Sequence, residues 1–287
     1  MRKHLSHLKN AVLAKRLAFI PGHFYSPICD PAELRSRYRD PNISGPVELP
    51  GIDLNARGQI ERLMRWRPFL ADARFPETPQ LDRRYKGNRL YGVGDAIPLY
   101  CFIRELRPRK IIEIGSGFSS ACMLDTADSL DLDIDFTFID PYSGNLDEFL
   151  RSEDRKCAAF MRVRVQDAPL TTFDAREAGD MLIIDSTHVL KTCSDVAFEL
   201  FTILPALKPG VFIHFHDIFY PFEYPSWWVL AENYSWNEAY ALRALLMYQS
   251  RFRIEFWNHY LAIAHADVVQ REAPDLGAGA SLWLSRT

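Results

Sequence analysis

The pattern of apolar and polar positions changes near residue 95. Residues 21–95 are rich in Pro, Gly and Arg and show little regular periodicity, so turns and loops are expected there. One exception is the stretch 56–73, in which apolar residues recur at roughly helical spacing and predict a helix. This change in pattern predicts an N-terminal extension of helix and loops over residues 1–94 and a main domain over residues 95–287.

Short apolar runs alternate with amphipathic stretches beyond this point. The segment "DAIPLYCFIRELRP" predicts a helix that ends before Pro108. Alternating strands and helices are typical of a parallel sheet with helices on both faces. The predicted strands are Lys110–Ile114, Phe136–Ile139, Met161–Val165, Met181–Ile184, Val211–His216, "FRIEFW" and "SLWLSR". The predicted helices between and after them are Ser119–Ser129, Leu146–Arg151, Val189–Ala206 and Asn237–Gln249.

Composition excludes several classes of protein. Of the 287 residues, 48% are hydrophobic, which is enough for a sizeable core, and the net charge of −3 gives no reason to expect a nucleic-acid-binding surface. No apolar run reaches the length of a membrane span. The basic start of the chain predicts a surface helix rather than a signal peptide, because Lys15 and Arg16 interrupt its apolar stretch. Five scattered cysteines indicate reduced thiols and a cytoplasmic protein.

A glycine pair follows the first predicted strand of the main domain. In "IIEIGSGFSS", Glu113 precedes Gly115, Ser116 and Gly117, and a helix is expected to begin just after them. Glycines allow a sharp turn and let a ligand approach the backbone. The dinucleotide fingerprint requires a third glycine three residues after the second, but Ser120 stands there. Taken alone, the pair is equally compatible with a tight connection between strand and helix.

Polar residues also follow the next two predicted strands. Asp140 ends the second strand, where a carboxylate can accept hydrogen bonds from both hydroxyls of a ribose, although a turn or helix-cap aspartate is common. Gln166 and Asp167 follow the third strand and could bind the edge of an adenine ring. Ligands of open parallel sheets bind beyond the carboxyl ends of the strands. The order of these residues therefore favours an adenosine-containing ligand.

These residues resemble the motif of the class I methyltransferases, which use S-adenosylmethionine. The family has an acid followed by Gly-x-Gly, which corresponds here to Glu113, Gly115 and Gly117, while Ser119 replaces a common further glycine. The resemblance covers about residues 95–287. It implies an α/β, Rossmann-like, doubly wound seven-stranded sheet that is mostly parallel with an antiparallel last strand, and "SLWLSR" would form that strand.

Four further titratable side chains follow the fourth and fifth predicted strands. Asp185 ends the fourth strand and His188 lies three residues on, while His216 and Asp217 end the fifth strand. Adjacent parallel strands end at the same edge of a sheet, so we expect the four to lie close together. Each residue alone has an ordinary structural interpretation, and His188 could simply begin the next helix. Perturbed titratable groups nevertheless gather at active sites.

This arrangement resembles the catechol O-methyltransferase-like branch and the sugar O-methyltransferases. The resemblance implies a general base at His188 and a divalent metal held by Asp185, His216 and Asp217. Magnesium prefers oxygen ligands, so the imidazole of His216 leaves the identity of the metal undecided. Metal-free catalysis by His188 with Asp217 is the alternative. Histidine has a suitable pKa for a general base near neutral pH.

The sequence thus predicts S-adenosylmethionine-dependent O-methylation of a sugar or another small-metabolite hydroxyl. An aromatic-rich segment, residues 217–240, follows the fifth strand and would suit a saccharide or aromatic acceptor. Two alternatives remain: a metal-dependent oxygenase on the same fold, and a non-catalytic cofactor-binding partner of another enzyme. Assembly as a homo-oligomer is left open.

Overall fold

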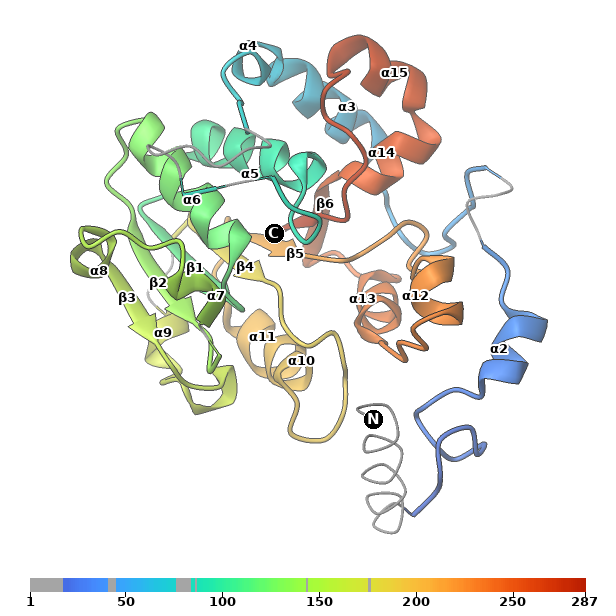
Figure 1. The fold of residues 1–287 in the computed structure, drawn as a ribbon. Helices are drawn as coiled ribbons and strands as arrows, with labels where there is room; N and C mark the ends of the chain where they lie inside the picture. Colours follow the sequence, from blue (N-terminus) through green and yellow to red (C-terminus); the bar gives the residue numbers. More distant parts are fainter. Residues whose placement is uncertain (1–17, 41–44, 76–83, 86, 143, 175–176) are drawn as a thin grey trace. The chain divides into compact units, whose positions relative to one another are not determined.

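The computed structural model describes residues 18–40, 45–75, 84–85, 87–142, 144–174 and 177–287 (Figure 1). The helix predicted for the basic start of the chain lies almost wholly outside these residues. In the described part of the chain, no helix has both the length and the apolar character needed to cross a membrane.

The described residues belong to two compact units. One combines residues 18–40 with Tyr224–Trp236, and the other combines Pro41–Glu223 with Asn237–Thr287. The boundary predicted between residues 94 and 95 stays a prediction, since the two units divide the chain at other places.

A seven-stranded sheet forms the centre of the larger unit. Its order is β3-β2-β1-β4-β5-β7-β6, and β7 runs antiparallel to both of its neighbours while the other pairs are parallel. The strands are β1 (Lys110–Ile114), β2 (Asp135–Ile139), β3 (Ala158–Met161), β4 (Met181–Ile184), β5 (Phe212–Phe215), β6 (Phe252–Trp257) and β7 (Leu282–Arg286). The predicted fold class is confirmed, including the antiparallel strand.

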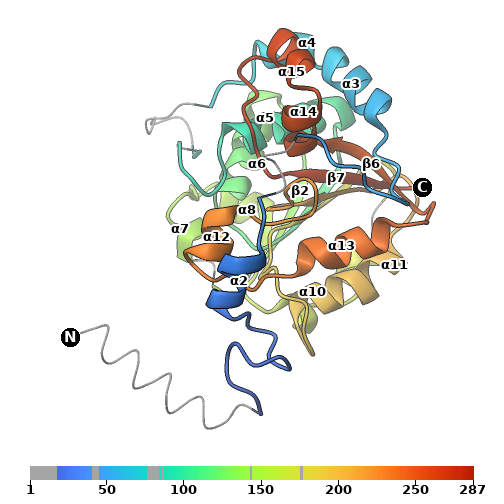
Figure 2. The same ribbon diagram turned by 90° about the vertical axis from the view of Figure 1, so that its right-hand side faces the viewer.

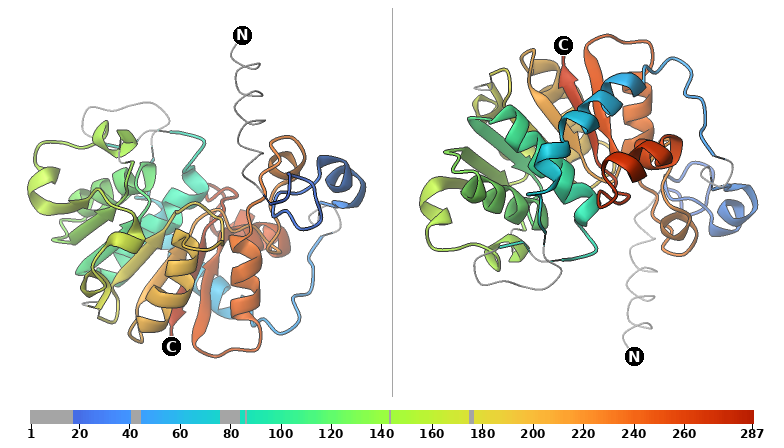
Figure 3. Two further views of the ribbon diagram at one scale, coloured as in Figure 1. Left: turned by 90° about the horizontal axis from the view of Figure 1, so that it is seen from below. Right: turned by 90° about the horizontal axis from the view of Figure 1, so that it is seen from above.

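The central strands are apolar on both faces because helices cover both faces. Every residue of β4 is buried, as expected for a parallel strand inside a doubly wound sheet. Figure 2 shows α5, α6, α3, α14 and α15 on one face of the sheet and α10, α11 and α13 on the other. Figure 3 shows the same two layers from below and from above.

Three helices of the larger unit precede β1, and the other described helices of this unit lie between strands. The three are α3 (Ala56–Arg65), α4 (Arg67–Leu70) and α5 (Val93–Leu106). The others are α6 (Phe118–Ser129), α7 (Gly144–Asp147), α8 (Asp154–Cys157), η2 (Val165–Asp167, a 3₁₀ turn), α9 (Thr171–Asp174), α10 (Asp195–Phe198), η3 (Glu199–Ile203, a π-helical stretch), α11 (Leu204–Ala206), α13 (Glu238–Leu246), α14 (Asn258–Ala264) and α15 (Ala266–Glu272). The smaller unit holds α2 (Pro31–Arg37) and α12 (Ser226–Leu230).

Three predicted elements were placed wrongly. The third strand is β3, which ends at Met161 where the prediction began, and Val165–Asp167 forms the 3₁₀ turn η2. The helix predicted over Leu146–Arg151 is instead α7, which ends at Asp147. The helix predicted from Val189 begins only at α10, after a loop whose Ser194 caps it by accepting a hydrogen bond from the Ala197 amide.

The register brings the ends of the central strands to one edge. Ile114 of β1 lies opposite Ile139 of β2 and Ile184 of β4, and Ile184 lies opposite Phe215 of β5. The residues that follow these strands therefore emerge side by side, and most of the predicted site residues lie there.

Candidate active site

The glycine turn after β1 is pressed against the loop that follows β4. Gly115 has φ +78°, and a Cβ built on it would lie 1.8 Å from the carbonyl oxygen of Asp185. The Gly115 amide donates to the Ile139 carbonyl at 3.0 Å, and the Asp185 amide donates to the Ile114 carbonyl at 2.9 Å. A side chain cannot be accommodated at Gly115 without moving the backbone on either side.

A cavity of about 180 Å³ opens beside this turn. Its walls come from the segment before α5, the glycine turn, the start of α6 and the ends of β2 and β4. The lining residues are Leu90, Tyr91, Gly115, Ser116, Gly117, Phe118, Ser119, Asp140 and Asp185. A Cβ built on Gly117 would meet no atom within 4 Å, so the space next to this backbone is open.

Glu113 does not line this cavity but is fully buried behind it. Its two carboxyl oxygens accept hydrogen bonds from the hydroxyls of Ser119 and Ser120 in the first turn of α6. Desolvation raises the pKa of Glu113 to about 8, against the lowering effect of these two bonds. The structure thus shows Glu113 joining β1 to α6, and direct contact with a cofactor stays a prediction.

Asp140 lies at the rim of the same cavity. Its Oδ2 accepts hydrogen bonds from the amide and the hydroxyl of Ser116 at 3.0 and 3.2 Å, and its Oδ1 accepts one from the Tyr142 amide at 2.6 Å. These bonds fix the carboxylate beside the glycine turn, where its remaining lone pairs can face a ligand hydroxyl.

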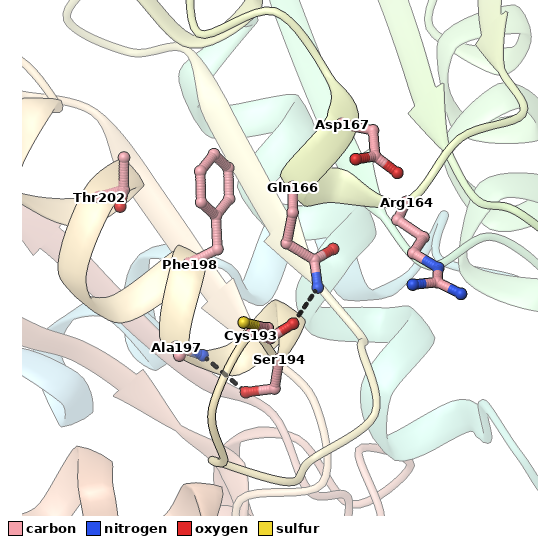
Figure 4. Close-up of a pocket in the computed structure, with 8 residues that line it drawn as sticks. All are labelled: Arg164, Gln166, Asp167, Cys193, Ser194, Ala197, Phe198 and Thr202. Atoms are coloured by element: carbon pink, nitrogen blue, oxygen red, sulfur yellow. Dashed lines mark hydrogen bonds between the residues drawn. The ribbon is translucent and has the colours of Figure 1, made fainter.

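Gln166 and Asp167 line a different cavity, of about 450 Å³ (Figure 4). The Gln166 side chain donates a hydrogen bond of 2.9 Å to the Cys193 carbonyl, as the dashed line in Figure 4 shows. The other lining residues are Arg164, Cys193, Ser194, Ala197, Phe198 and Thr202. The structure therefore does not bring these two predicted adenine contacts into the cavity that Asp140 lines.

The four titratable residues after β4 and β5 do lie together. His188 Nε2 is 3.6 Å from Asp185 Oδ1 and 3.7 Å from Asp217 Oδ2, and His216 Nε2 is 3.6 Å from Asp217 Oδ1. Both His188 and Asp217 have a positive φ, +59° and +58°, in the left-handed region that non-glycine residues seldom adopt. Such local strain is concentrated at functional sites.

His188 is fixed by the start of α13. Its Nδ1 lies 2.8 Å from Oε2 of Glu238, and its backbone carbonyl accepts hydrogen bonds from the amides of Asn237 and Glu238. An ionised carboxylate only accepts, so Nδ1 carries a hydrogen and Nε2 is left facing Asp185 and Asp217. Burial lowers the pKa of His188, but the bond and charge of Glu238, helped by Asp185 and Asp217, raise it above its usual value.

His216 makes a different set of contacts. Its Nε2 lies 3.1 Å from the Leu90 carbonyl oxygen, so this nitrogen is a donor. Burial lowers the pKa of His216, but the nearby charges of Asp217 and Asp185 outweigh it and raise the pKa to about 9. Desolvation likewise raises the pKa of Asp217, although His216 and His188 oppose this. The separation of 3.6 Å places His216 and Asp217 within ion-pair distance at the end of β5.

The predicted metal ligands do not fit a divalent ion. His216 Nε2 donates to the Leu90 carbonyl, so only its buried Nδ1, which has no partner among the described residues, could offer a lone pair to an ion. Within the ranges that the structure describes, no three His, Cys, Asp or Glu side chains converge as a metal site would require. Asp185, His216 and Asp217 are better explained by their contacts with one another and with His188.

The sequence did not predict a role in the site for two buried glutamates, Glu238 and Glu199. Glu238 begins a predicted helix, where an acid is common, so nothing in the sequence distinguished it. Glu199 left a signal, because it is a single acid within the apolar run "VAFELFTIL". In the structure Glu199 is fully buried, and Ser186 donates a hydrogen bond of 3.0 Å to its Oε2.

Most of the aromatic-rich segment belongs to the smaller unit. There, the rings of Tyr224, Trp228 and Tyr234 pack around Trp236, with centroid separations of 5.9, 5.1 and 4.6 Å. The expected role of this segment as a wall for an acceptor stays a prediction.

Comparison with known proteins places the chain in a family. A family model described as a methyltransferase domain matches residues 112–218, which include both the glycine turn and the ends of β4 and β5. An uncharacterised protein of Archaeoglobus fulgidus is 34% identical over 166 residues, which are 55% of this chain and 74% of the relative. The chain belongs to the class I methyltransferase family.

Solved methyltransferase structures show more distant similarity. The methyltransferase PaMTH1 of Podospora anserina, bound to S-adenosylhomocysteine (SAH), is 14% identical, with a TM-score of 0.45 over 79% of this chain and 88% of that chain. The apo form of CmcI is 17% identical, with a TM-score of 0.42 over 70% and 73% of the two chains. These two likenesses concern the fold alone. Membership of the class I methyltransferase family implies S-adenosylmethionine as the methyl donor.

Proposed function

We propose that this methyltransferase transfers a methyl group to a hydroxyl oxygen of a sugar or another small metabolite, with His188 as the general base. The observation that carries the proposal is the fixed imidazole of His188. Glu238 holds its Nδ1, and its Nε2 lies 3.6 Å from a carboxylate oxygen of Asp185, a residue that also lines the cavity beside the glycine turn.

The cofactor is proposed to bind at that cavity. The open backbone of Ser116 and Gly117 and the carboxylate of Asp140 support this placement, because a ribose needs a nearby acceptor for its hydroxyls and close access to the main chain. The adenine would then extend towards Gln166 and Asp167, which line the second cavity of about 450 Å³. A bound cofactor would have to join two cavities that are separate in the structure.

The chain's own residues account for the proton chemistry. Bound S-adenosylmethionine supplies a methyl group on a positively charged sulfur, and an acceptor oxygen displaces that sulfur in line. His188 Nε2 would take the hydroxyl proton as the oxygen–carbon bond forms, and Glu238 would stabilise the resulting imidazolium through Nδ1. Asp217 lies close enough to orient the acceptor hydroxyl or the imidazole.

This mechanism does not use a metal, and the poor fit of Asp185, His216 and Asp217 to an ion supports that choice. For the same reason, nothing in the described residues favours the oxygenase alternative. The saccharide class of acceptor is proposed from the aromatic-rich segment after β5 alone. A cytoplasmic location remains a prediction, and assembly as a homo-oligomer stays open.

The test is methyl transfer from methyl-labelled S-adenosylmethionine to a pool of sugars, nucleotide sugars and small hydroxyl compounds. His188→Ala should lose about 10²–10⁴-fold in turnover, the usual range for removal of a general base, while SAH affinity and thermal stability stay near those of the parent protein. His265→Ala, which removes a histidine bonded to Tyr260 away from the site, serves as the matched control. Turnover of His188→Ala within a few-fold of the parent would exclude His188 as the base.

A further inference from the structure

Glu199 and Glu238 form a pair of buried carboxyl groups, and each group has one oxygen without a partner. Glu199 is 0% exposed and Glu238 is 1% exposed. Among the described residues, neither Oε1 of Glu199 nor Oε1 of Glu238 has a hydrogen-bond partner, whereas the second oxygen of each is bonded. A buried polar atom without a partner is destabilising, so native structures rarely leave such atoms unpaired.

Both carboxyl groups are held against the same loop. Ser186 donates to Glu199 Oε2 at 3.0 Å, and His188, two residues later, contacts Glu238 Oε2 at 2.8 Å. The helices that carry them, the α10–η3–α11 run and α13, lie on the same face of the sheet (Figure 2). Glu199 begins the π-helical stretch η3, and π-helical turns inside α-helices are frequent at functional sites.

Burial and the surrounding charges act on the protonation of Glu199. Burial, followed by the charges of Glu238, Asp195 and Asp185, raises the pKa of Glu199 well above its usual value, and only the bond from Ser186 opposes this. These effects favour the protonated form of Glu199, whose hydroxyl needs an acceptor. Glu238, paired with the His188 imidazole, has a carboxylate oxygen that needs a donor.

We propose that Glu199 is a positioning residue whose carboxylic acid donates a hydrogen bond to Glu238, directly or across one water molecule, and so holds the carboxylate that orients His188. This inference rests on the proposed role of His188 and extends it by one residue. The hydrogen bond satisfies both unpaired oxygens at once. It also keeps the negative charge on Glu238, which the Nδ1–H of His188 requires.

A matched pair of substitutions separates this role from simple packing. Glu199→Gln keeps a donor of the same length, because the amide nitrogen can bond Glu238, whereas Glu199→Leu keeps the bulk and loses the donor. Glu199→Gln should retain most of the turnover. Glu199→Leu should lose about 10–100-fold in turnover, as is typical when the partner of a functional side chain is removed, with SAH affinity unchanged. A residue that only packs would tolerate leucine at least as well as glutamine.

Two spectroscopic measurements decide the proposal without methyl transfer. Infrared spectra at pH 7 should show a protonated carboxylic acid that Glu199→Gln removes. Glu113, whose pKa is also raised, should contribute a second such band, and Glu113→Gln identifies it. Exposed Glu177, which pairs with Lys208, serves as the negative control and should contribute no band. In histidine-labelled protein, the proton NMR signal of the His188 Nδ1–H should persist in Glu199→Gln and shift or disappear in Glu199→Leu.

The outcomes also distinguish this inference from the proposed function. The inference is overturned if the parent and Glu199→Gln show the same carboxylic-acid bands, or if the Nδ1–H signal is unchanged in Glu199→Leu. Either result counts against it even if the enzyme methylates hydroxyls. If the parent protein methylates no hydroxyl while the band and the signal behave as expected, the proposed function fails and the Glu199–Glu238–His188 arrangement stands. Failure of Glu199→Leu to fold leaves the infrared comparison of Glu199→Gln to decide the question.

Discussion

Replacement of the two glycines in the turn after β1 by alanine should have opposite effects on folding and on binding. At Gly115, φ is +78° and the new Cβ would lie 1.8 Å from the Asp185 carbonyl oxygen. At Gly117, φ is 175°, within the extended range, and the new Cβ would meet no atom within 4 Å. The two substitutions add the same methyl group two residues apart, so each is a control for the other.

The structure gives the size of the effect at Gly115. A left-handed conformation costs a non-glycine residue about 1–2 kcal/mol. Forcing an atom into a packed site costs typically about 1–3 kcal/mol more. The atom in the way is backbone, and the main-chain bonds to Ile139 and Ile114 hold both sides of the contact. Gly115→Ala should therefore lose about 2–5 kcal/mol of unfolding free energy, whereas Gly117→Ala should change it by less than about 1 kcal/mol.

Urea unfolding followed by circular dichroism measures the change in unfolding free energy, and calorimetric titration with SAH measures the change in cofactor affinity. Gly117→Ala should fold normally but bind SAH at least about tenfold more weakly, because its methyl group occupies space beside the cofactor, a difference of about 1.4 kcal/mol. If Gly115→Ala unfolds at the urea concentration of the parent, the close approach of Asp185 is wrong. If Gly117→Ala binds SAH as tightly as the parent, the cofactor does not approach that backbone.

Three further predictions concern the same site. Burial raises the pKa of Glu113 in the folded protein to about 8, above the usual 4.5 of glutamate. Its contribution to stability is therefore full below pH 4.5 and is lost as the pH rises towards 8. Urea unfolding at several pH values should show this loss of stability in the parent protein and not in Glu113→Gln. Asp140→Ala should weaken SAH binding by about 1–3 kcal/mol in calorimetry, and Asp140→Asn by less, because an acceptor oxygen remains; equal affinity in all three proteins would remove Asp140 from the site. Turnover should survive thorough chelation, since Asp185, His216 and Asp217 do not converge as a metal site would require. Loss of turnover that a divalent ion restores would show that the reaction needs a metal.

The sequence predicted best what depends on local apolar runs. β1 and β4 have the predicted bounds because each is a short, continuous, buried run. β3 was displaced because "MRVRV" alternates perfectly, yet Val165 enters a 3₁₀ turn and Arg162 pairs with the Asp147 carboxylate instead of extending the strand. Alternation over five residues did not distinguish a strand from a loop with two exposed arginines.

The site was predictable where it follows strand ends and unpredictable where it depends on helices placed by tertiary packing. Asp185, His188 and Asp217 come together because β4 and β5 are adjacent and parallel, which the order of elements implied. Glu238 reaches His188 only because the carbonyl of His188 accepts bonds from the start of α13. That contact joins residues 50 positions apart, and no motif marks it.

We propose that the methyl donor binds beside the glycine turn, with its sulfur end next to His188. A crystal structure of the enzyme soaked with SAH tests this most directly. We expect the ribose hydroxyls on the Asp140 carboxylate, the chain of the ligand along Gly115–Gly117, and the sulfur on the side of Asp185 and His188. Density for SAH elsewhere, or with its sulfur directed away from His188, would contradict the account.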